Sequence, residues 1–578
     1  MIHRLFSFLC VAMLWMALIY LFPPAAAVLA QKDDGRITIT AEDITQMRAV
    51  RMADVLNQVP GLKAGDSSVA IHGNYKVKVF MDGRPINDPT SALGGVKWDL
   101  VSLENVETIE ILKGKGGLKY GDDASGGVIL ISTKKIRRLS GNVKAYGGNH
   151  ETQSYSGNCR FLKGSLGGAV SGALDSTNGY QVNNDKEKWR AGTKLEYAID
   201  DRFNAALSAD YIEEEKGNAG TKDYPTPYSR LESNMQSYSL RVNGKSLSMN
   251  SYFNSGWKHN TDESKSLDQE LRVKEAGQDI GATFSTGKWG SLNCGAAFEW
   301  GQASGTTMDD DQEETGLSFF GSESIQVPKL PLTVTIGLRG NFYSAFDDSI
   351  NPEIKATWQE KKWNIGFAYN RSNNTPSFHQ RYNRTSSKLP NPDLTIEIAD
   401  NYSLCAFRQL GASLSVNMTL FYNQLTDRIT YIRNDEGIGR YENVGEVTYK
   451  GGDVSLGWTI SSQFKLKTFY TYLEARDETT DLWLTSKPRH KAGAELYCTP
   501  IDKLSLVASV DYTSAVYISK DNSKQTPEYT LLDLRGEYRF RQFSFFAEIQ
   551  NLADANYCYV DNLVGPPRTW IAGVNWTF

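Results

Sequence analysis

The stretch that decides the fold is KLEYAIDDRFNAALSADY, residues 194–211. Apolar and polar side chains alternate on both sides of Asp200-Asp201, and successive strand residues point to opposite faces, so the stretch predicts two strands joined by a tight turn. The same alternation occurs in LTVTIGLR (332–339) and SLSVNMTLFY (413–422). Soluble sandwiches alternate as well, so this pattern alone does not distinguish a protein core from lipid.

The spacing of the turns indicates a membrane barrel. Between the alternating segments lie longer polar connections, such as residues 213–234 and 476–490. Short turns at one end and long loops at the other are typical of outer-membrane barrels, in which every strand edge must be paired. Ten short turns predict eleven hairpins, hence about 22 antiparallel strands over residues 140–578. The short turns lie near Lys163-Gly164, Asp200-Asp201, Asn243-Gly244, Gly287-Lys288, Pro328-Lys329, Lys361-Lys362, Gln409-Leu410, Ser461-Ser462, Asp502-Lys503 and Arg541-Gln542.

The last segment favours lipid over a soluble core. TWIAGVNWTF (569–578) places Trp570, Ala572, Val574, Trp576 and Phe578 on one face. Trp570 and Phe578 are separated by roughly 26 Å at the rise of a strand, which matches two aromatic girdles around an apolar band. We therefore expect the chain to lie in a bacterial outer membrane.

Composition excludes several other classes. A mean hydropathy of −0.42 argues against a bundle of membrane helices, and a net charge of −5 gives no basic face for nucleic acid. The one long apolar run, residues 5–22, precedes small residues and then polar ones, which predicts a secretory signal at residues 1–30; the alternative is an uncleaved helical anchor. The remaining cysteines are far apart and never in C-x-x-C spacing, so we expect no disulfide framework and no metal site.

A barrel of about 22 strands has a wide lumen, and barrels of this size are plugged. Residues 31–139, with mixed helix and strand signals, are therefore predicted to form an α+β plug. Within them, KGKGGLKYGDDASGGVILIST (113–133) has the glycine spacing of a phosphate loop, but Asp122-Asp123 stands where that loop needs Lys-Ser/Thr. We interpret these glycines as turn and packing residues.

Residues 37–135 resemble the plug of TonB-dependent outer-membrane receptors. The similarity rests on ITITAEDITQM (37–47), MADVLNQVPGL (52–62), VAIHGN (69–74), VKVFMDGRPIND (77–88) and residues 103–135. Barrel phrases are similar too: LPNPDLTIE (389–397), FYNQLTDRI (421–429), YENVGEVTYKGG (441–452), YTLLDLRGEY (529–538) and EIQNLADANY (548–557).

The resemblance implies import of a scarce metal chelate, a siderophore-iron complex or cobalamin, and no permanently bound cofactor. It also implies energisation by TonB, with ExbB and ExbD, pulling on the plug. We expect a monomer, since a closed barrel needs no partner strand. The alternatives are a haem receptor and a non-energised pore or adhesin. No nucleophile elbow, H-E-x-x-H motif or histidine cluster indicates an enzyme.

The predicted ligand contacts lie in two plug loops, residues 62–68 and 87–98, which would face the long barrel loops. They are Lys63, Asp66, Ser67, Ser68, Asn87, Asp88, Thr90, Ser91 and Trp98. His379 and Arg381 are possible contacts from a barrel loop, because haem-binding relatives place an axial histidine there. His72 replaces the arginine of the family's I-R-G strand; the alternative is that both histidines are ordinary surface or wall residues.

The resemblance is weakest at the segment that TonB contacts. The family carries a short TonB box and a linker ahead of the plug, whereas here only QKDDGR precedes ITIT. Either residues 36–40 double as that box or coupling is altered. The candidates for TonB contact are Arg36, Ile37, Thr38, Ile39 and Thr40.

Overall fold

The computed structural model describes residues 35–91, 94–287, 290–385, 387–434, 436–558 and 563–578. The predicted signal at residues 1–30 lies outside the described residues. Among the helices of the described part, none is both long enough and apolar enough to cross a bilayer.

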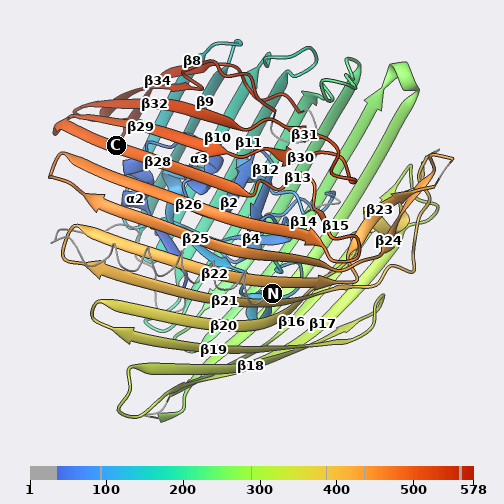
Figure 1. Ribbon diagram of the computed structural model, residues 1–578. Helices are drawn as coiled ribbons and strands as arrows, with labels where there is room; N and C mark the ends of the chain where they lie inside the picture. The colour runs from blue at the N-terminus through green and yellow to red at the C-terminus, as the bar shows by residue number, and fades with distance from the viewer. Residues whose placement is uncertain (1–34, 92–93, 288–289, 386, 435, 559–562) are drawn as a thin grey trace, which may run out of the picture.

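A closed antiparallel barrel makes up most of the chain (Figure 1). Its wall has 22 strands, as predicted, and the last strand pairs with the first through Ile571↔Gly148 to Thr577↔Asn142. The two-residue strand β27 (Leu482–Trp483) extends the pairing of β26. The 22 strands are β8 (Ser140–Gly148), β9 (Gln153–Lys163), β10 (Leu166–Thr177), β11 (Lys186–Ala198), β12 (Asn204–Gly217), β13 (Ser229–Asn243), β14 (Leu247–Asp262), β15 (Leu267–Ser285), β16 (Gly290–Gly305), β17 (Gln312–Gln326), β18 (Leu332–Tyr343), β19 (Ser349–Glu360), β20 (Trp363–Asn374), β21 (Glu397–Leu410), β22 (Leu414–Thr426), β25 (Val447–Thr459), β26 (Phe464–Asp477), β28 (His490–Ile501), β29 (Leu504–Thr513), β32 (Tyr529–Phe540), β33 (Phe543–Gln550) and β34 (Thr569–Thr577).

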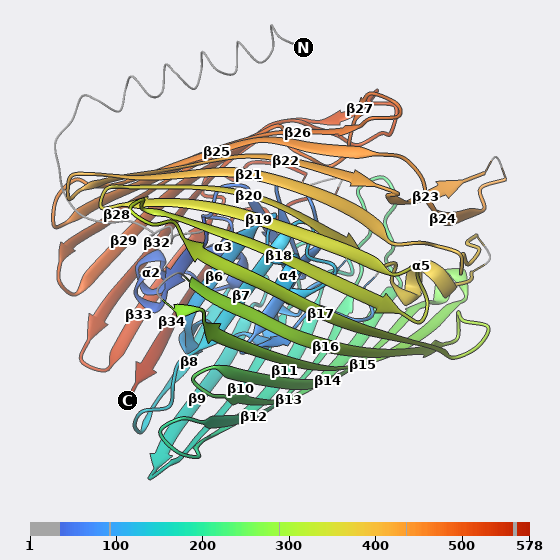
Figure 2. The ribbon, with the colours of Figure 1, turned by 90° about the horizontal axis from the view of Figure 1, so that it is seen from below.

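The two ends of the barrel differ, as the turn spacing predicted. Each of the ten predicted short turns lies at or within two residues of a break between successive strands at one end, which we call the turn end. Gly141 and Phe578 exchange backbone hydrogen bonds there, so both ends of the wall lie at the turn end. The opposite, loop end carries the hairpins β23 (Ile429–Arg433) with β24 (Gly439–Asn443) and β30 (Val516–Tyr517) with β31 (Gln525–Thr526). Figure 2 shows β23, β24 and the helix α5 (Phe378–Tyr382) at this end.

The alternating side chains separate a lipid face from a lumen face. Leu195, Tyr197 and Leu207 are 43%, 51% and 52% exposed on the outside, whereas Ser208 is buried on the inside. On the final strand, Trp570 and Trp576 also face outward. The period of two therefore produces an apolar exterior and a polar lumen.

The plug is an α+β unit inside the lumen (Figure 1). Its five-stranded sheet has the order β1-β6-β7-β4-β5, with β4 and β7 parallel, and the hairpin β2–β3 lies apart from it. The core is largely its own, since nearly all the buried apolar residues of the main cluster come from the plug. The elements are β1 (Ile37–Thr40), α2 (Ala41–Met47), α3 (Met52–Leu56), β2 (Leu62–Gly65), β3 (Ser68–Ile71), β4 (Val77–Met81), β5 (Arg84–Pro85), β6 (Val106–Lys113), α4 (Gly117–Tyr120) and β7 (Gly127–Thr133), with single 3₁₀ turns at Trp98–Leu100 and Leu103–Asn105.

Local sequence explains how the plug elements begin and turn. Thr40 caps α2 by accepting a hydrogen bond from the Asp43 backbone, while the Asp43 carboxylate accepts one from the Thr40 backbone. Asp82 and Gly83 join β4 to β5 and both have positive φ, as a two-residue hairpin requires. The Asp-Gly pair thus forms the turn of an antiparallel hairpin.

The glycine-rich stretch is a packing element. Gly127 has φ +135°, and a Cβ built there would lie 2.2 Å from the Leu112 carbonyl oxygen. Asp122 accepts a hydrogen bond from the Tyr343 hydroxyl at 2.7 Å, and Asp123 pairs with Lys76 at 2.9 Å. The two carboxylates that argued against a phosphate loop thus bind groups of the plug and wall.

Replacing Gly127 by alanine should destabilise the plug, because the new Cβ would strain the backbone and collide with the Leu112 carbonyl. We expect a cost of about 2 kcal/mol or more, seen as a lower Tm of the purified protein in detergent. The matched control is Gly321→Ala in the wall, where a Cβ meets nothing within 4 Å. An unchanged Tm for Gly127→Ala would contradict the packing role.

Candidate functional site

The turn between β2 and β3 points toward the loop end. Asp66 is 75% exposed there and lies 3.5 Å from the ammonium of Lys186 at the start of β11. This lysine holds the pKa of the Asp66 carboxyl below its usual range. Ser67 is also exposed, and its carbonyl accepts a hydrogen bond from the Val96 backbone. Of the predicted contacts, these two side chains are the most open to the barrel mouth.

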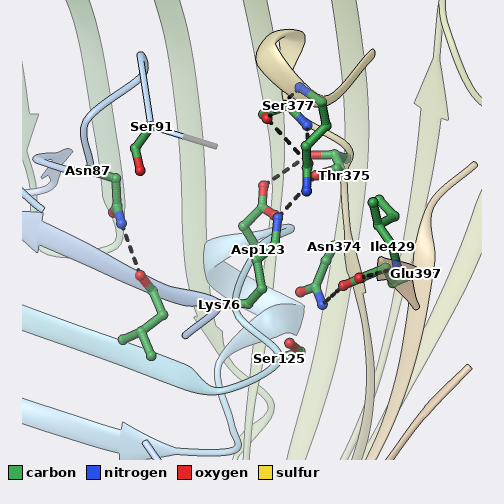
Figure 3. Close-up of polar contacts among 12 residues, drawn as sticks. Lys76, Asn87, Ser91, Asp123, Ser125, Asn374, Thr375, Ser377, Glu397 and Ile429 are labelled. Carbon is green, nitrogen blue, oxygen red and sulfur yellow. Dashed lines mark hydrogen bonds and ion pairs between the residues drawn. The ribbon is translucent and has the colours of Figure 1, made fainter. Parts of the chain in front are cut away.

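The second predicted loop uses most of its polar groups internally. Asn87 accepts from the Val79 backbone and donates to the Val77 carbonyl (Figure 3). Asp88 accepts from Thr90 and lies 3.3 Å from the Lys97 ammonium. Ser91 accepts from the Gly95 backbone at 2.8 Å. These bonds fold the loop, so the described geometry leaves few of its side chains free for a ligand.

The other three predicted plug contacts differ in their surroundings. Trp98 is buried, and its indole N–H donates to the Ser68 carbonyl at 3.3 Å. Lys63, on β2, has its ammonium nitrogen buried without a hydrogen-bond partner among the described residues. Burial and the nearby Lys491 charge lower the pKa of Lys63 to about 8. The ligand role of all nine plug residues remains a prediction.

A polar link joins the plug to the wall close to these loops (Figure 3). The Lys76 ammonium lies 2.9 Å from Asp123 and 3.2 Å from the Thr375 carbonyl, and the Thr375 hydroxyl donates to Asp123. Beside it, Glu397 accepts from the Asn374 amide and from the Ile429 backbone, each at 2.7 Å. The loop after β20 is thereby fixed against the plug.

His379 and Arg381 lie on α5, a short helix in that same loop. Arg381 pairs with Glu314 on β17, donates to the Pro392 carbonyl and lies over the rings of Phe346 and Tyr382. Burial lowers the pKa of the His379 imidazole to about 3, with contributions from two lysines. Arg381 is occupied by structural contacts, and a ligand role for either residue remains a prediction.

His72 anchors the plug to the wall. Its Nε2 lies 2.7 Å from an oxygen of Asp453 on β25, and its ring stacks on Phe421 with centroids 3.6 Å apart. The same Asp453 oxygen accepts from the Lys113 ammonium at 2.7 Å, while the other accepts from Thr471. All four polar residues are buried, and burial lowers the pKa of His72, so Lys113 carries the positive charge of this anchor.

Further ion pairs surround the plug. They connect plug residues to β8, β11, β12, β16 and β32, and few apolar side chains cross the boundary. The pairs are Arg48–Glu537, Lys78–Glu299, Arg84–Asp210, Asp82–Lys194, Asp99–Lys188 and Glu104–Lys144. The plug is thus held mainly by polar contacts.

The predicted TonB segment is part of the plug sheet. Residues 37–40 form the edge strand β1, paired antiparallel with β6, and Arg36 binds Glu110 at 2.8 Å. Ile39 is buried in the core and Thr40 caps α2. The other edge of β1 pairs with no strand of the described plug sheet.

Comparisons with known proteins identify the family. The model described as "TonB dependent receptor-like, beta-barrel" matches residues 131–552, and "TonB-dependent Receptor Plug Domain" matches residues 31–128. The chain belongs to the TonB-dependent receptor family. It is therefore an outer-membrane receptor and not an enzyme, and the turn end faces the periplasm.

Individual relatives are distant but cover nearly the whole chain. The vitamin B12 transporter BtuB of Photobacterium profundum is 21% identical, covering 93% of this chain and 92% of the relative. The iron-regulated outer membrane virulence protein of Vibrio cholerae is 22% identical, covering 91% and 90%. The crystal structure of the siderophore receptor PirA from Acinetobacter baumannii superposes with a TM-score of 0.80 at 16% identity, covering 96% of this chain and all of that one.

Within the described residues, no three His, Cys, Asp or Glu side chains gather as a metal site.

Two features of the site, the helix α5 and the wall residue Asp453, were not predicted. The helix α5 was missed, although Ser377 and Gln380 form a capping box that signals it. Asp453 was missed too; its signal is a carboxylate on the lumen face of an alternating strand.

Replacing Asp453 by alanine should loosen the plug, because it leaves the buried Lys113 ammonium without a carboxylate. Removing one partner of a buried pair costs about 3–5 kcal/mol. We expect faster proteolysis of the plug in the folded barrel, measured by timed digestion in detergent. The control is Asp201→Ala, at an exposed position in a short turn; equal digestion rates for the two variants would argue against the anchor.

Proposed function

We propose that this receptor captures a scarce metal chelate, siderophore-iron or cobalamin, at the loop end and imports it into the periplasm. The observation that carries the proposal is the polar attachment of a self-contained plug inside a closed wall. Such a plug blocks passive flow, yet its boundary with the wall can rehydrate without exposing an apolar core. The names of the relatives support both ligand classes and give no support to haem.

Energisation would come from TonB with ExbB and ExbD, and the receptor would act as a monomer. We infer that TonB pairs with the free edge of β1 and then pulls on residues 36–40. An exposed edge strand offers unpaired backbone groups to a partner, which is the basis of strand addition. The residue bounds of signal, plug and barrel, 1–30, 31–139 and 140–578, are part of this proposal.

Replacing Ile37 by proline should uncouple transport while leaving binding intact. Proline is tolerated at the first residue of an edge strand but removes a backbone donor, so energised uptake should fall by about tenfold or more. The measurement is uptake of labelled ferric siderophore and labelled cobalamin by whole cells, beside surface binding at 4 °C. Deletion of residues 35–40 is a second, less specific variant for the same uptake test, since it removes the whole edge strand.

Ile37→Val is the matched control, because it keeps both the strand and the backbone donor. Undiminished uptake by Ile37→Pro would refute pulling through this segment. Single-channel conductance of the purified wild type should show a sealed barrel; a steady open conductance would instead support the pore alternative.

A further inference from the structure

Most cations near the loop end are paired with carboxylates. Lys76, Lys97 and Lys186 lie 2.9, 3.3 and 3.5 Å from Asp123, Asp88 and Asp66. One group differs: within the part of the chain that the structure describes, its members form no ion pair. We call this group the cationic cluster: Lys63, Arg428, Lys487, Arg489 and Lys491.

The cluster lies at the loop end, where the wall meets the plug. Lys487 precedes β28; its ammonium donates to the Gly73 carbonyl and lies 4.2 Å from the centre of the Tyr75 ring. Lys491, on β28, donates to the Leu62 carbonyl at 3.0 Å. Both lysines therefore contact the plug near Lys63. All members of the cluster are half-buried.

Like charges act on one another here without compensation. Burial together with Arg428 and Lys63 lowers the pKa of Lys487 to about 7. The positive charge of Lys491 contributes to the lowered pKa of Lys63, whose ammonium has no hydrogen-bond partner among the described residues. Within the cluster, Lys491 is the member whose charge Asp453 and Asp511 partly offset. Lys63, Lys487 and Arg428 therefore form a positive region of the cluster, and none of the three makes an ion pair with a described carboxylate.

Repulsion among these unpaired cations lowers the stability of the folded protein unless an anion binds between them. Buried or half-buried charges are normally paired, and this chain pairs them at many other places around the plug. Aromatic rings accompany the cations: Tyr75 under Lys487 and Trp483 under Arg489, the latter at 4.2 Å. Cations beside flat apolar faces suit an anion with a delocalised or aromatic body.

We propose that the cationic cluster is the subsite for negatively charged groups of the transported ligand, which is therefore an anionic metal chelate of catecholate or carboxylate type. This rests on the proposed import function and narrows it, since an uncharged corrinoid leaves the cluster unpaired. The fixed positive region also steers an anion to this part of the loop end and orients it there.

The test uses the full-length protein in detergent with three probes: a ferric triscatecholate complex, ferric citrate and cyanocobalamin. Binding is followed by titration calorimetry and by quenching of tryptophan fluorescence, to which Trp483 contributes. At least one anionic probe should bind, more weakly at high salt, and cyanocobalamin should not. The double variant Lys63→Met with Lys487→Met should raise the Kd of the anionic probe that binds by about tenfold or more.

Matched variants separate charge from packing. Lys63→Arg with Lys487→Arg should keep most of the affinity, and Lys222→Met, at an exposed loop position, should bind like the wild type. In the absence of ligand, Lys487→Met should raise the Tm, because it removes repulsion; a purely structural lysine, lost with its bond to Gly73, would lower it. The single Lys63→Met serves if the double variant does not fold.

The outcomes are distinct from those of the import proposal. Anion affinity that is unchanged in the double methionine variant, or binding of cyanocobalamin alone, would overturn the charge assignment while leaving import intact. Import fails separately, if cells accumulate no labelled chelate although the purified wild type binds it.

Discussion

The constraint on which this structure depends is that lipid offers no hydrogen-bond partner to a strand edge. Every wall strand must therefore be paired on both sides, and the chain satisfies this by joining β34 to β8. Closure with 22 strands leaves a lumen too wide for side chains to fill. A separately folded plug is the consequence, and its position brings the two predicted ligand loops to one end and the edge strand β1 into reach of the other.

The boundary between plug and wall reconciles sealing with movement. An apolar boundary would behave like a protein core, since separating it would expose a large hydrophobic area. Here the boundary consists mainly of ion pairs and hydrogen bonds, of which His72, Lys113 and Asp453 form the most buried group. Water can replace such contacts one at a time, so the plug can be firmly placed at rest and still move under force.

Residues near one another in sequence were predicted well, and distant partners were not. The alternation in residues 194–211 and the short turns follow from local chemistry, which is why strand number and lipid face agree with the structure. The partner of His72 is 381 positions away and depends on the register of a closed wall. Asn87 and Trp98 were predicted as ligand contacts from their place in an apical loop; the bonds of Asn87 to the backbone of β4 and the burial of Trp98 were not predicted. Only the fold shows these contacts.

The charge pairs across the boundary also bear on how such receptors can diversify. Asp210, Asp453 and Glu537 belong to the wall, while their cationic partners Arg84, Lys113 and Arg48 belong to the plug. A plug grafted from a distant homologue would bury those carboxylates opposite whatever side chains it happened to carry. Exchange of plugs between barrels would thus carry an electrostatic penalty unless the partner charges of the wall changed with them.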